Sequence, residues 1–373
     1  MKTFPFWNLV KRMKHPLPAH PERICVLRLS ALGDVCNLVP TVRALQRQWP
    51  QARITWIIGK GEHSLLAGLS GVEFIVYDKG SGLAGMRELW RRLSDTRFDV
   101  LLHMQQSLRA SILSLGLKAK VRIGYDKARA KDWQHWFTRY HLASHPQAHV
   151  LESFMDFARR LGVDPTITSQ RPEWGVPIPD EAYDEALRMT GEEPYLLISP
   201  CANPRLRNFR NWSAEGYAAV IDHAWSQYGL KAVLTGGSST KEREMGARIS
   251  ALVPPEATID TIGQVSLKTL LALIERARVA IAPDSGPVHM ANALDTPTIG
   301  LYATTNPDRA GPFLWRHMAV NRYPEAVRTY LHKEVDEIPW GQRVRHPDAM
   351  SLIHAEDVIE RLDTLLSESA DET

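Results

Sequence analysis

Two short turns hold the residues whose types and spacing could do chemistry. In the first, Ser30-Ala31-Leu32-Gly33-Asp34 follows the apolar run Ile24 to Leu29 and ends in a carboxylate. In the second, Asp284-Ser285-Gly286-Pro287 follows the apolar run Val279 to Ala282 and precedes a helix through His289 to Leu294. Both turns are expected at the carboxyl end of a strand, where ligands of open α/β sheets bind. A carboxylate there can accept a proton from a substrate hydroxyl.

The second turn is suited to an anion. Ser285 is a typical N-cap residue, and Pro287 fits the first helical turn, where its missing N–H would have no partner. Such a turn leaves backbone N–H groups unpaired at a helix start, beside Gly286, which has no side chain, and this arrangement holds phosphate. The alternative is a capped helix in a parallel sheet without a ligand. The first turn has the same alternative, with Asp34 as a helix cap.

Several familiar nucleotide motifs are missing from the sequence. The first turn is not G-x-G-x-x-G, and Gly59-Lys60-Gly61 is not part of a G-x-x-x-x-G-K-[ST] loop, so neither a nicotinamide dinucleotide nor a P-loop is favoured. There is no Asp-x-Asp pair to grip a metal-bound diphosphate. A diphosphate would therefore depend on cations and backbone N–H groups. The best cations lie in the loop Pro204 to Trp212, with Arg205, Arg207 and Arg210; a solvated basic loop is the alternative.

The elements that must position these turns alternate between strand and helix patterns. This alternation predicts mostly parallel, doubly wound α/β sheets in both halves of the chain. The expected strands are 24–29, 54–58, 74–77, 100–103, 121–124, 195–199, 232–235, 258–261, 279–282 and 298–302. The expected helices are one from Val35 or Asn37, and 62–69, 86–93, 108–115, 150–161, 214–225, 241–252, 267–276, 289–294 and 351–366.

The length of 373 residues favours two domains, because one hydrophobic core rarely grows so large. Asp164 to Pro179 contains four prolines and little periodicity, which is typical of a linker. We therefore expect an N-terminal arm at 1–22, a first domain at 23–170 and a linker at 171–180. A second domain should follow at 181–345, and a C-terminal helix within 346–373 could cross back to the first domain.

Composition limits the class of protein. Hydrophobic residues make up 44% and charged residues 23%, which is typical of a soluble globular enzyme. The three cysteines form no C-x-x-C pair, which favours a reducing compartment over a disulfide framework. Between Arg87 and Arg139, twelve Lys or Arg stand against five Asp or Glu, so this part of the first half is a candidate surface for an anionic partner.

The N-terminal arm has no apolar run long enough for a secretory signal or a spanning helix. Its large apolar residues, among them Phe4, Phe6 and Trp7, stand beside Lys11 and Arg12. This mixture could lie on an anionic membrane face. An arm packed on the first domain is the alternative.

At this point the sequence resembles a known family. Asp284 to Ala291, followed by Pro297, Gly300, Pro307 and Gly311-Pro312, resembles the signature of glycosyltransferase family 9, the lipopolysaccharide heptosyltransferases. Arg28 to Val35 is similar to that family's N-terminal turn, and Arg210-Asn211-Trp212 to its Lys-x-Trp element. The resemblance extends from about Ile24 to beyond Pro312. It implies a GT-B fold, in which two Rossmann-like domains face each other across a cleft, with the nucleotide sugar on the second and the acceptor on the first.

The resemblance also implies roles for individual residues. Asp34 would be the general base in the acceptor turn that contains Gly33, and Arg210 the cation for the leaving diphosphate. The remaining donor-binding residues would be Ser199, Glu242, which would bind the ribose, Asp284, Ser285, Gly286 and His289. The sequence departs from the family pattern where Arg210 replaces the commoner Lys, and where Ala303 and Asn306 replace Gly and Asp.

The implied reaction is an inverting, metal-independent transfer of L-glycero-D-manno-heptose from ADP-heptose to a Kdo residue of lipid A. We expect a monomer at the cytoplasmic surface of the inner membrane, with no cofactor and no nucleic-acid partner. Alternatives are a later core sugar or a protein as acceptor, or a non-catalytic module that binds nucleotides or polyanions. Candidates for the anionic acceptor are the basic residues of the first half, although each could be merely solvated: Arg109, Lys120, Arg122, Lys127, Arg129 and Lys131.

Overall fold

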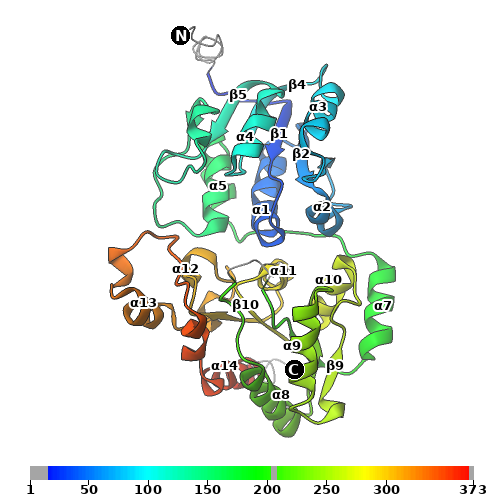
Figure 1. Ribbon diagram of the computed structural model, residues 1–373. Helices are drawn as coiled ribbons and strands as arrows, with labels where there is room; N and C mark the ends of the chain where they lie inside the picture. The colour runs from blue at the N-terminus through cyan, green and yellow to red at the C-terminus, as the bar shows by residue number, and fades with distance from the viewer. Residues whose placement is uncertain (1–15, 203–207, 369–373) are drawn as a thin grey trace. The chain divides into compact units, whose positions relative to one another are not determined.

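Apolar runs and amphipathic segments alternate in the structure as the sequence predicts. The computed structural model describes residues 16–202 and 208–368, and the chain divides into two units between Trp174 and Gly175. Each unit is an open sheet of six parallel strands with helices on both faces (Figure 1). The doubly wound α/β class expected from the sequence is confirmed. The first fifteen residues, which include the apolar side chains of the N-terminal arm, and the basic residues Arg205 and Arg207 lie outside the described residues.

The first unit has the strand order β3-β2-β1-β4-β5-β6. Its strands are β1 (Arg23–Leu27), β2 (Arg53–Gly59), β3 (Val72–Tyr77), β4 (Arg97–His103), β5 (Lys118–Gly124) and β6 (Tyr140–His141). Its helices are α1 (Leu32–Gln48), α2 (Lys60–Leu66), α3 (Gly82–Arg92), α4 (Leu108–Leu115), α5 (Val150–Leu161) and α6 (Pro165–Thr168), with a 3₁₀ turn η2 (Gln134–Trp136) before β6.

The second unit has the strand order β12-β11-β10-β7-β8-β9. Its strands are β7 (Tyr195–Ile198), β8 (Lys231–Leu234), β9 (Thr258–Asp260), β10 (Val279–Pro283), β11 (Thr298–Tyr302) and β12 (Val320–Asn321). Its helices are α7 (Asp180–Thr190), α8 (Ala214–Tyr228), α9 (Thr240–Ser250), α10 (Leu267–Arg276), α11 (Gly286–Ala293), α12 (Pro307–Ala310), α13 (Tyr323–Leu331) and α14 (Ala355–Glu368).

Both sheets have the same topology. The first strand of each unit pairs with the second on one side and with the fourth on the other, so the strand order reverses beside β1 and beside β7. In doubly wound sheets, ligands bind outside the carboxyl ends of the strands at this switch point. The two turns selected from the sequence follow β1 and β10, and each therefore lies at the switch point of its own unit.

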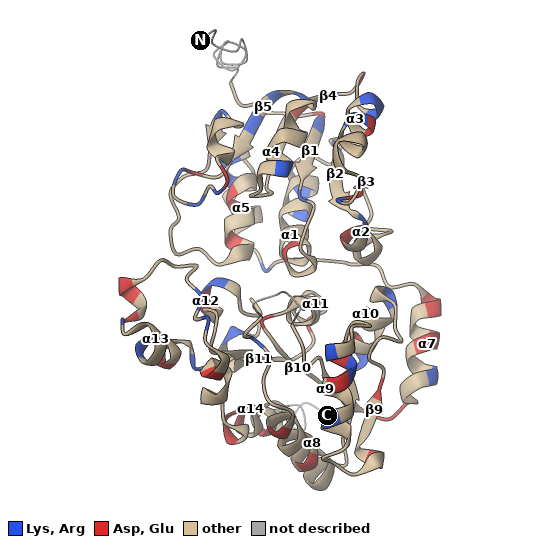
Figure 2. Ribbon diagram, viewed as in Figure 1, with Lys and Arg blue, Asp and Glu red and all other residues tan. Residues whose placement is uncertain are grey.

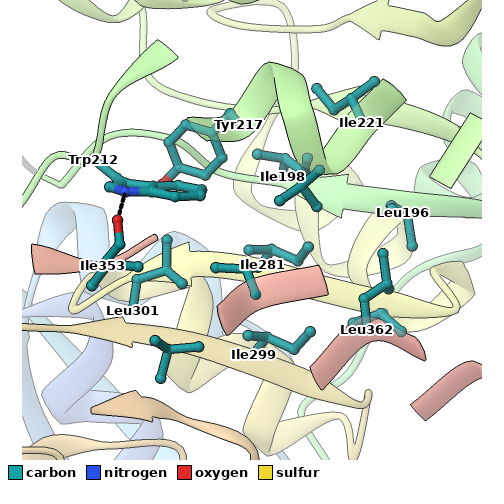
Figure 3. Packing of buried hydrophobic residues seen from close by; sticks show 14 of the residues in the cluster. Leu196, Ile198, Trp212, Tyr217, Ile221, Ile281, Ile299, Leu301, Ile353 and Leu362 are labelled. Carbon is teal, nitrogen blue, oxygen red and sulfur yellow. Dashed lines mark hydrogen bonds between the residues drawn. The ribbon is translucent and has the colours of Figure 1, made fainter. Parts of the chain in front are cut away.

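Alternating strand residues build the cores. In the first unit, Leu27, Ile57 and Leu101 face α3 and α4. In the second unit, Ile198 and Ile281 belong to a buried cluster that also includes side chains of α8 and α14 (Figure 3). The last helix, α14, packs on α8 and β11, and its residues Val358 and Leu362 belong to the buried cluster of the second unit.

Trp212 ties the loop after β7 to this core. Its indole N–H donates to the carbonyl of Ile353 at 3.0 Å, and its ring meets that of Tyr217 edge to face at 4.9 Å (Figure 3). A Cβ at Gly216 would lie 2.4 Å from Cζ2 of Trp212, so only glycine allows this close approach. The core thereby fixes the loop segment that also contains Arg210.

One local expectation was wrong. The helix expected from Val35 or Asn37 begins at Leu32, which brings Asp34 into its first turn. Within the proline-rich stretch 164–179, Asp164 accepts the N–H of Thr166 and starts the short helix α6. In addition, no helix among residues 16–202 and 208–368 is both long enough and apolar enough to cross a membrane.

Trp212→Phe should destabilise the protein, because the Ile353 carbonyl loses its donor in the interior. We expect a loss of about 1–3 kcal/mol in the free energy of unfolding, measured by urea titration with circular dichroism. Trp133→Phe is the matched control, because Trp133 is 59% exposed and its replacement should change stability by less than about 0.5 kcal/mol. Equal unfolding midpoints for the two variants would contradict the structural role of Trp212.

Candidate functional site

The first turn places Asp34 in the opening turn of α1. The carboxylate oxygen Oδ2 accepts the N–H of Ala31 at 3.1 Å and lies 2.5 Å from Nη2 of Arg28. The Asp34 side chain is 34% exposed, whereas that of Arg28 is only 10% exposed. Asp34 is therefore not the N-cap residue of α1, which is Ala31; it is the third helical residue, and its carboxylate accepts the N–H of the cap residue.

Arg28 is a buried cation that needs a negative partner. Its Nη1 donates to the carbonyl of Met104 at 2.6 Å, and the guanidinium lies 5.1 Å from the centroid of the Phe154 ring. A buried charge is costly unless it is paired and hydrogen-bonded. Asp34 supplies the opposite charge, at 2.5 Å from Nη2 of Arg28.

Gln105 joins the turn after β1 to the end of β4. Its Oε1 accepts the N–H groups of Leu29 at 3.0 Å and of Ser30 at 3.2 Å. Nε2 of Gln134, in η2, donates to the carbonyl of Gln105 at 3.2 Å and to that of His103 at 2.7 Å. Gln105 was not predicted from the sequence, where the available signal was a glutamine just after the strand at the switch point. These bonds hold the Asp34 turn in one conformation.

His103 is neutral in this network. Burial, and secondarily the nearby charge of Arg122, lower the pKa of His103 to about 3. Its Nδ1 lies 3.0 Å from Nε2 of Gln134, which fits an acceptor nitrogen facing an amide donor. Because the imidazole does not charge near neutral pH, it acts as a fixed support and is not a proton carrier.

The second turn brings Arg210 onto Asp284. Nη1 of Arg210 donates to the carbonyl oxygen of Asp284 at 2.6 Å and lies 3.6 Å from its carboxylate oxygen Oδ2. Asn208 accepts from Nε of Arg210 at 3.3 Å, and Asn211 accepts the N–H of Ala202 at 2.9 Å. The Arg210 side chain is 16% exposed. The guanidinium is therefore oriented beside the start of α11 before any ligand binds.

Ser285 occupies the N-cap position of α11, as expected, but its side chain does not cap the helix. Its Oγ is buried and has no hydrogen-bond partner within the described parts of the chain. The first N–H groups of any α-helix have no partner inside the helix. A hydroxyl and a helix N-terminus thus meet at the switch point, directly beside Arg210.

The other donor candidates from the sequence lie around the same edge. Ser199 follows β7, is buried, and donates its backbone N–H to the carbonyl of Ile281. Gly286 and His289 belong to α11, and the His289 side chain is buried. The structure therefore gathers Ser199, Arg210, Asp284, Ser285, Gly286 and His289 at the carboxyl ends of β7 and β10.

Glu242 organises the neighbouring turn, after β8. Its Oε1 accepts the N–H of Gly237 at 2.8 Å, its Oε2 accepts the hydroxyl of Ser239, and Ser239 accepts the N–H of Glu242. Ser239 thus caps the N-terminus of α9, and the Glu242 carboxylate binds the cap hydroxyl and the preceding turn. Burial, and secondarily the charge of Glu242, raise the pKa of the Cys201 thiol to about 12, so Glu242 lies close to the turn after β7.

Two threonines at this edge were missed from the sequence. The Oγ1 atoms of Thr235, after β8, and Thr305, after β11, are buried and have no partner in the described structure. Buried polar groups are nearly always hydrogen-bonded, so each exception calls for an explanation such as a ligand. The available signal was a threonine just beyond the end of a strand.

The basic candidates of the first unit separate into two groups. Arg109, at the start of α4, and Lys127 and Lys131, after β5, are exposed and follow the carboxyl ends of strands. Nη1 of Arg109 donates to the carbonyl of Lys79 at 2.8 Å. These residues remain candidates for an anionic acceptor.

The other three basic candidates make internal contacts. Arg122 donates to the carbonyls of Ser114 and Leu117 at the end of α4, and burial lowers its pKa. Arg129 forms ion pairs with both Asp126 and Asp156. Lys120 pairs with Asp99 at 2.7 Å near the amino ends of β4 and β5, at the edge opposite Asp34. We therefore no longer expect Arg122, Arg129 or Lys120 to bind the acceptor.

Comparison with known proteins identifies close relatives. A lipopolysaccharide core heptosyltransferase, OpsX of Haemophilus influenzae, is 36% identical over 346 residues, which cover 92% of this chain and 97% of that protein. Lipopolysaccharide heptosyltransferase 3 of Escherichia coli K12 is 24% identical, and the match covers 91% of this chain and 96% of that protein.

Solved structures agree with the fold. A family 9 glycosyltransferase from Veillonella parvula superposes with a TM-score of 0.77 at 23% identity, covering 93% of this chain and 98% of that chain. The E. coli ADP-heptose lps heptosyltransferase II gives a TM-score of 0.72 at 21% identity, and the match covers 93% of this chain and 99% of that chain. These likenesses establish the fold, which is the expected GT-B type.

The family model for glycosyltransferase family 9 (heptosyltransferase) matches residues 86–336. With this match and the 36% identity to OpsX, the chain belongs to glycosyltransferase family 9, the heptosyltransferases.

Proposed function

We propose that this heptosyltransferase transfers L-glycero-D-manno-heptose from ADP-heptose to a Kdo residue of the lipid A inner core, with inversion. The observation that carries the proposal is the contact of Arg210 with Asp284 at the start of α11, which places a guanidinium beside a helix N-terminus at the switch point. The names of the relatives support a role in lipopolysaccharide core biosynthesis. Because lipid A is a membrane lipid, the reaction would occur at the cytoplasmic face of the inner membrane, with a monomeric enzyme.

The second unit would bind the donor. Arg210, the hydroxyl of Ser285 and the first N–H groups of α11 would hold the diphosphate, and Glu242 would accept hydrogen bonds from the ribose. A charge-assisted hydrogen bond contributes roughly 1.5–3 kcal/mol, and a helix N-terminus about 0.3–2 kcal/mol. Together these groups would absorb the negative charge that develops on the leaving ADP, so the proposal requires no metal ion.

The first unit would activate the acceptor. Asp34 would take the proton of the acceptor hydroxyl while the oxygen of that hydroxyl bonds to the anomeric carbon of heptose. The bond from that carbon to the phosphate oxygen breaks, and ADP leaves with the electron pair, so the configuration inverts. Arg28 would hold the carboxylate in place during attack. The same charge favours release of the proton from Asp34 afterwards, because it stabilises the ionised form.

The acceptor assignment can be tested with purified protein, ADP-heptose and a panel of truncated lipid A acceptors. We expect one heptose to be added to an acceptor that ends in Kdo, detected by mass spectrometry. No product should form with lipid A lacking Kdo, which is the matched control. Transfer only to acceptors that already contain heptose would instead assign the enzyme to a later core sugar.

Asp34→Asn should abolish most transfer, because the amide cannot accept the proton. A positioned general base contributes roughly 100- to 10,000-fold, so we expect turnover to fall by at least about 100-fold. Binding of ADP, measured by calorimetry, should be unchanged because the donor residues lie in the second unit. Asp95→Asn, at an exposed acid of the first unit, is the control and should keep full activity. Normal turnover of Asp34→Asn would refute its role as base.

Arg210→Ala should lower transfer by about 100-fold or more, the scale of one removed transition-state donor. Arg210→Lys should retain more activity, because it keeps the charge although not the planar geometry. Arg248→Ala removes an exposed cation of α9 that pairs with Glu215 at the surface, and it should have no effect. If Arg210→Ala and Arg248→Ala turned over equally, Arg210 would not stabilise the leaving group.

A further inference from the structure

Two tryptophans of the first unit are exposed side by side. Trp133 is 59% exposed and Trp136 is 57% exposed, and their rings stack with centroids 6.3 Å apart and planes inclined by 18°. Large aromatic side chains normally bury most of their surface, so an exposed pair marks an interaction site more often than a single exposed residue does.

The backbone holds these rings outward. Asp132 and Trp133 have φ angles of 49° and 56°, a left-handed conformation that residues other than glycine rarely adopt. The conformation is fixed on both sides. Asp132 accepts the N–H of Leu108 at 3.3 Å, and the Gln134 side chain is fully buried, where it binds the carbonyls of His103 and Gln105. Such costly backbone geometry persists where the surrounding structure enforces it, commonly at functional sites.

The surroundings of the pair are basic. Lys127 and Lys131 are exposed on the same loop, and Arg109 follows Leu108, which is itself 38% exposed. Figure 2 shows Lys and Arg along this loop between β5 and α5. The acids of the loop are already engaged, because Asp126 pairs with Arg129 and Asp132 accepts the N–H of Leu108. We define the tryptophan patch as Trp133 and Trp136 with the cations Lys127 and Lys131 of the same loop.

Hydrogen bonds connect this patch to the Asp34 turn. Gln134, between the two tryptophans, donates to the carbonyl of Gln105, and the Gln105 side chain accepts the N–H groups of Leu29 and Ser30. The patch and the candidate base therefore belong to one rigid edge of the first unit.

We propose that the tryptophan patch docks on an anionic phospholipid bilayer, with the rings at the headgroup level and the cations on lipid phosphates. Tryptophan favours the membrane interface because its ring is apolar and its N–H is polar, and cations near an anionic leaflet strengthen binding. The inference rests on the proposed function. A Kdo bound directly to lipid A lies close to the bilayer surface, so the base that activates it must come within a sugar or two of the headgroups.

The first test measures binding to vesicles with the full-length protein. Wild type should sediment with vesicles of phosphatidylcholine and phosphatidylglycerol, and more weakly with phosphatidylcholine alone. The double variant Trp133→Ala/Trp136→Ala should bind about tenfold more weakly. Lys127→Ala/Lys131→Ala should lose only the preference for the anionic lipid. The control is Leu115→Ala, which removes a 46% exposed leucine at the other end of α4 and should bind as wild type does. Wild-type binding by the tryptophan double variant would overturn the proposal.

The second test separates the bilayer from the sugar acceptor. Transfer is compared on an acylated Kdo acceptor embedded in vesicles and on its deacylated, soluble form. The double variant should show a raised KM on vesicles and normal kinetics on the soluble acceptor. Equal losses on both would refute bilayer docking and place acceptor sugars on the rings. If wild type transferred heptose to neither acceptor, the proposed function would fail, whereas the vesicle-binding result would still decide the docking surface.

Discussion

A parallel sheet that reverses its strand order leaves polar backbone groups without partners where the order changes. The loops after the first and fourth strands leave toward opposite faces, so neither covers the carboxyl ends of the two strands. Both units of this protein have that topology, and in both an arginine spans the gap. Arg28, just after β1, donates to the carbonyl of Met104 after β4, and Arg210, after β7, donates to the carbonyl of Asp284 after β10.

These two arginines make the two edges chemically different. Arg28 is buried and paired with Asp34, so the first edge presents a carboxylate that a buried guanidinium holds in place. Arg210 lies 3.6 Å from the Asp284 carboxylate and next to a helix N-terminus, so the second edge presents a guanidinium beside the first N–H groups of α11. Proton abstraction requires the first property and departure of a diphosphate requires the second. One topology thus supplies both halves of the proposed reaction.

Sequence patterns predict those elements whose ends are marked chemically. The bounds expected for α4, α5 and α10 match the structure, because Ser107, His149 and Ser266 cap their N-termini and Gly162 ends α5 in a left-handed conformation. The sequence analysis missed β6 and β12, which are two residues long and show no alternation. It placed the start of α1 too late, because the cap there is Ala31, held by the Asp34 side chain and not by its own. The roles of Asp34 and Arg210 in catalysis stay predictions.

Charge patterns locate a basic region but not the cations that a ligand can reach. Lys120 and Arg122 are two residues apart on β5 and therefore project from the same face. Arg122 reaches the last carbonyls of α4, whereas Lys120 lies nearer the amino end of the strand and meets Asp99. The two side chains differ in their contacts because of where α4 ends in space. The alternation of residues along a strand does not predict that position. Lys127 and Lys131 are exposed on the loop after β5, where Asp126 pairs with Arg129 and Asp132 accepts the N–H of Leu108. Which cations can meet an acceptor is thus decided by tertiary contacts of their neighbours, and the sequence alone could not separate them.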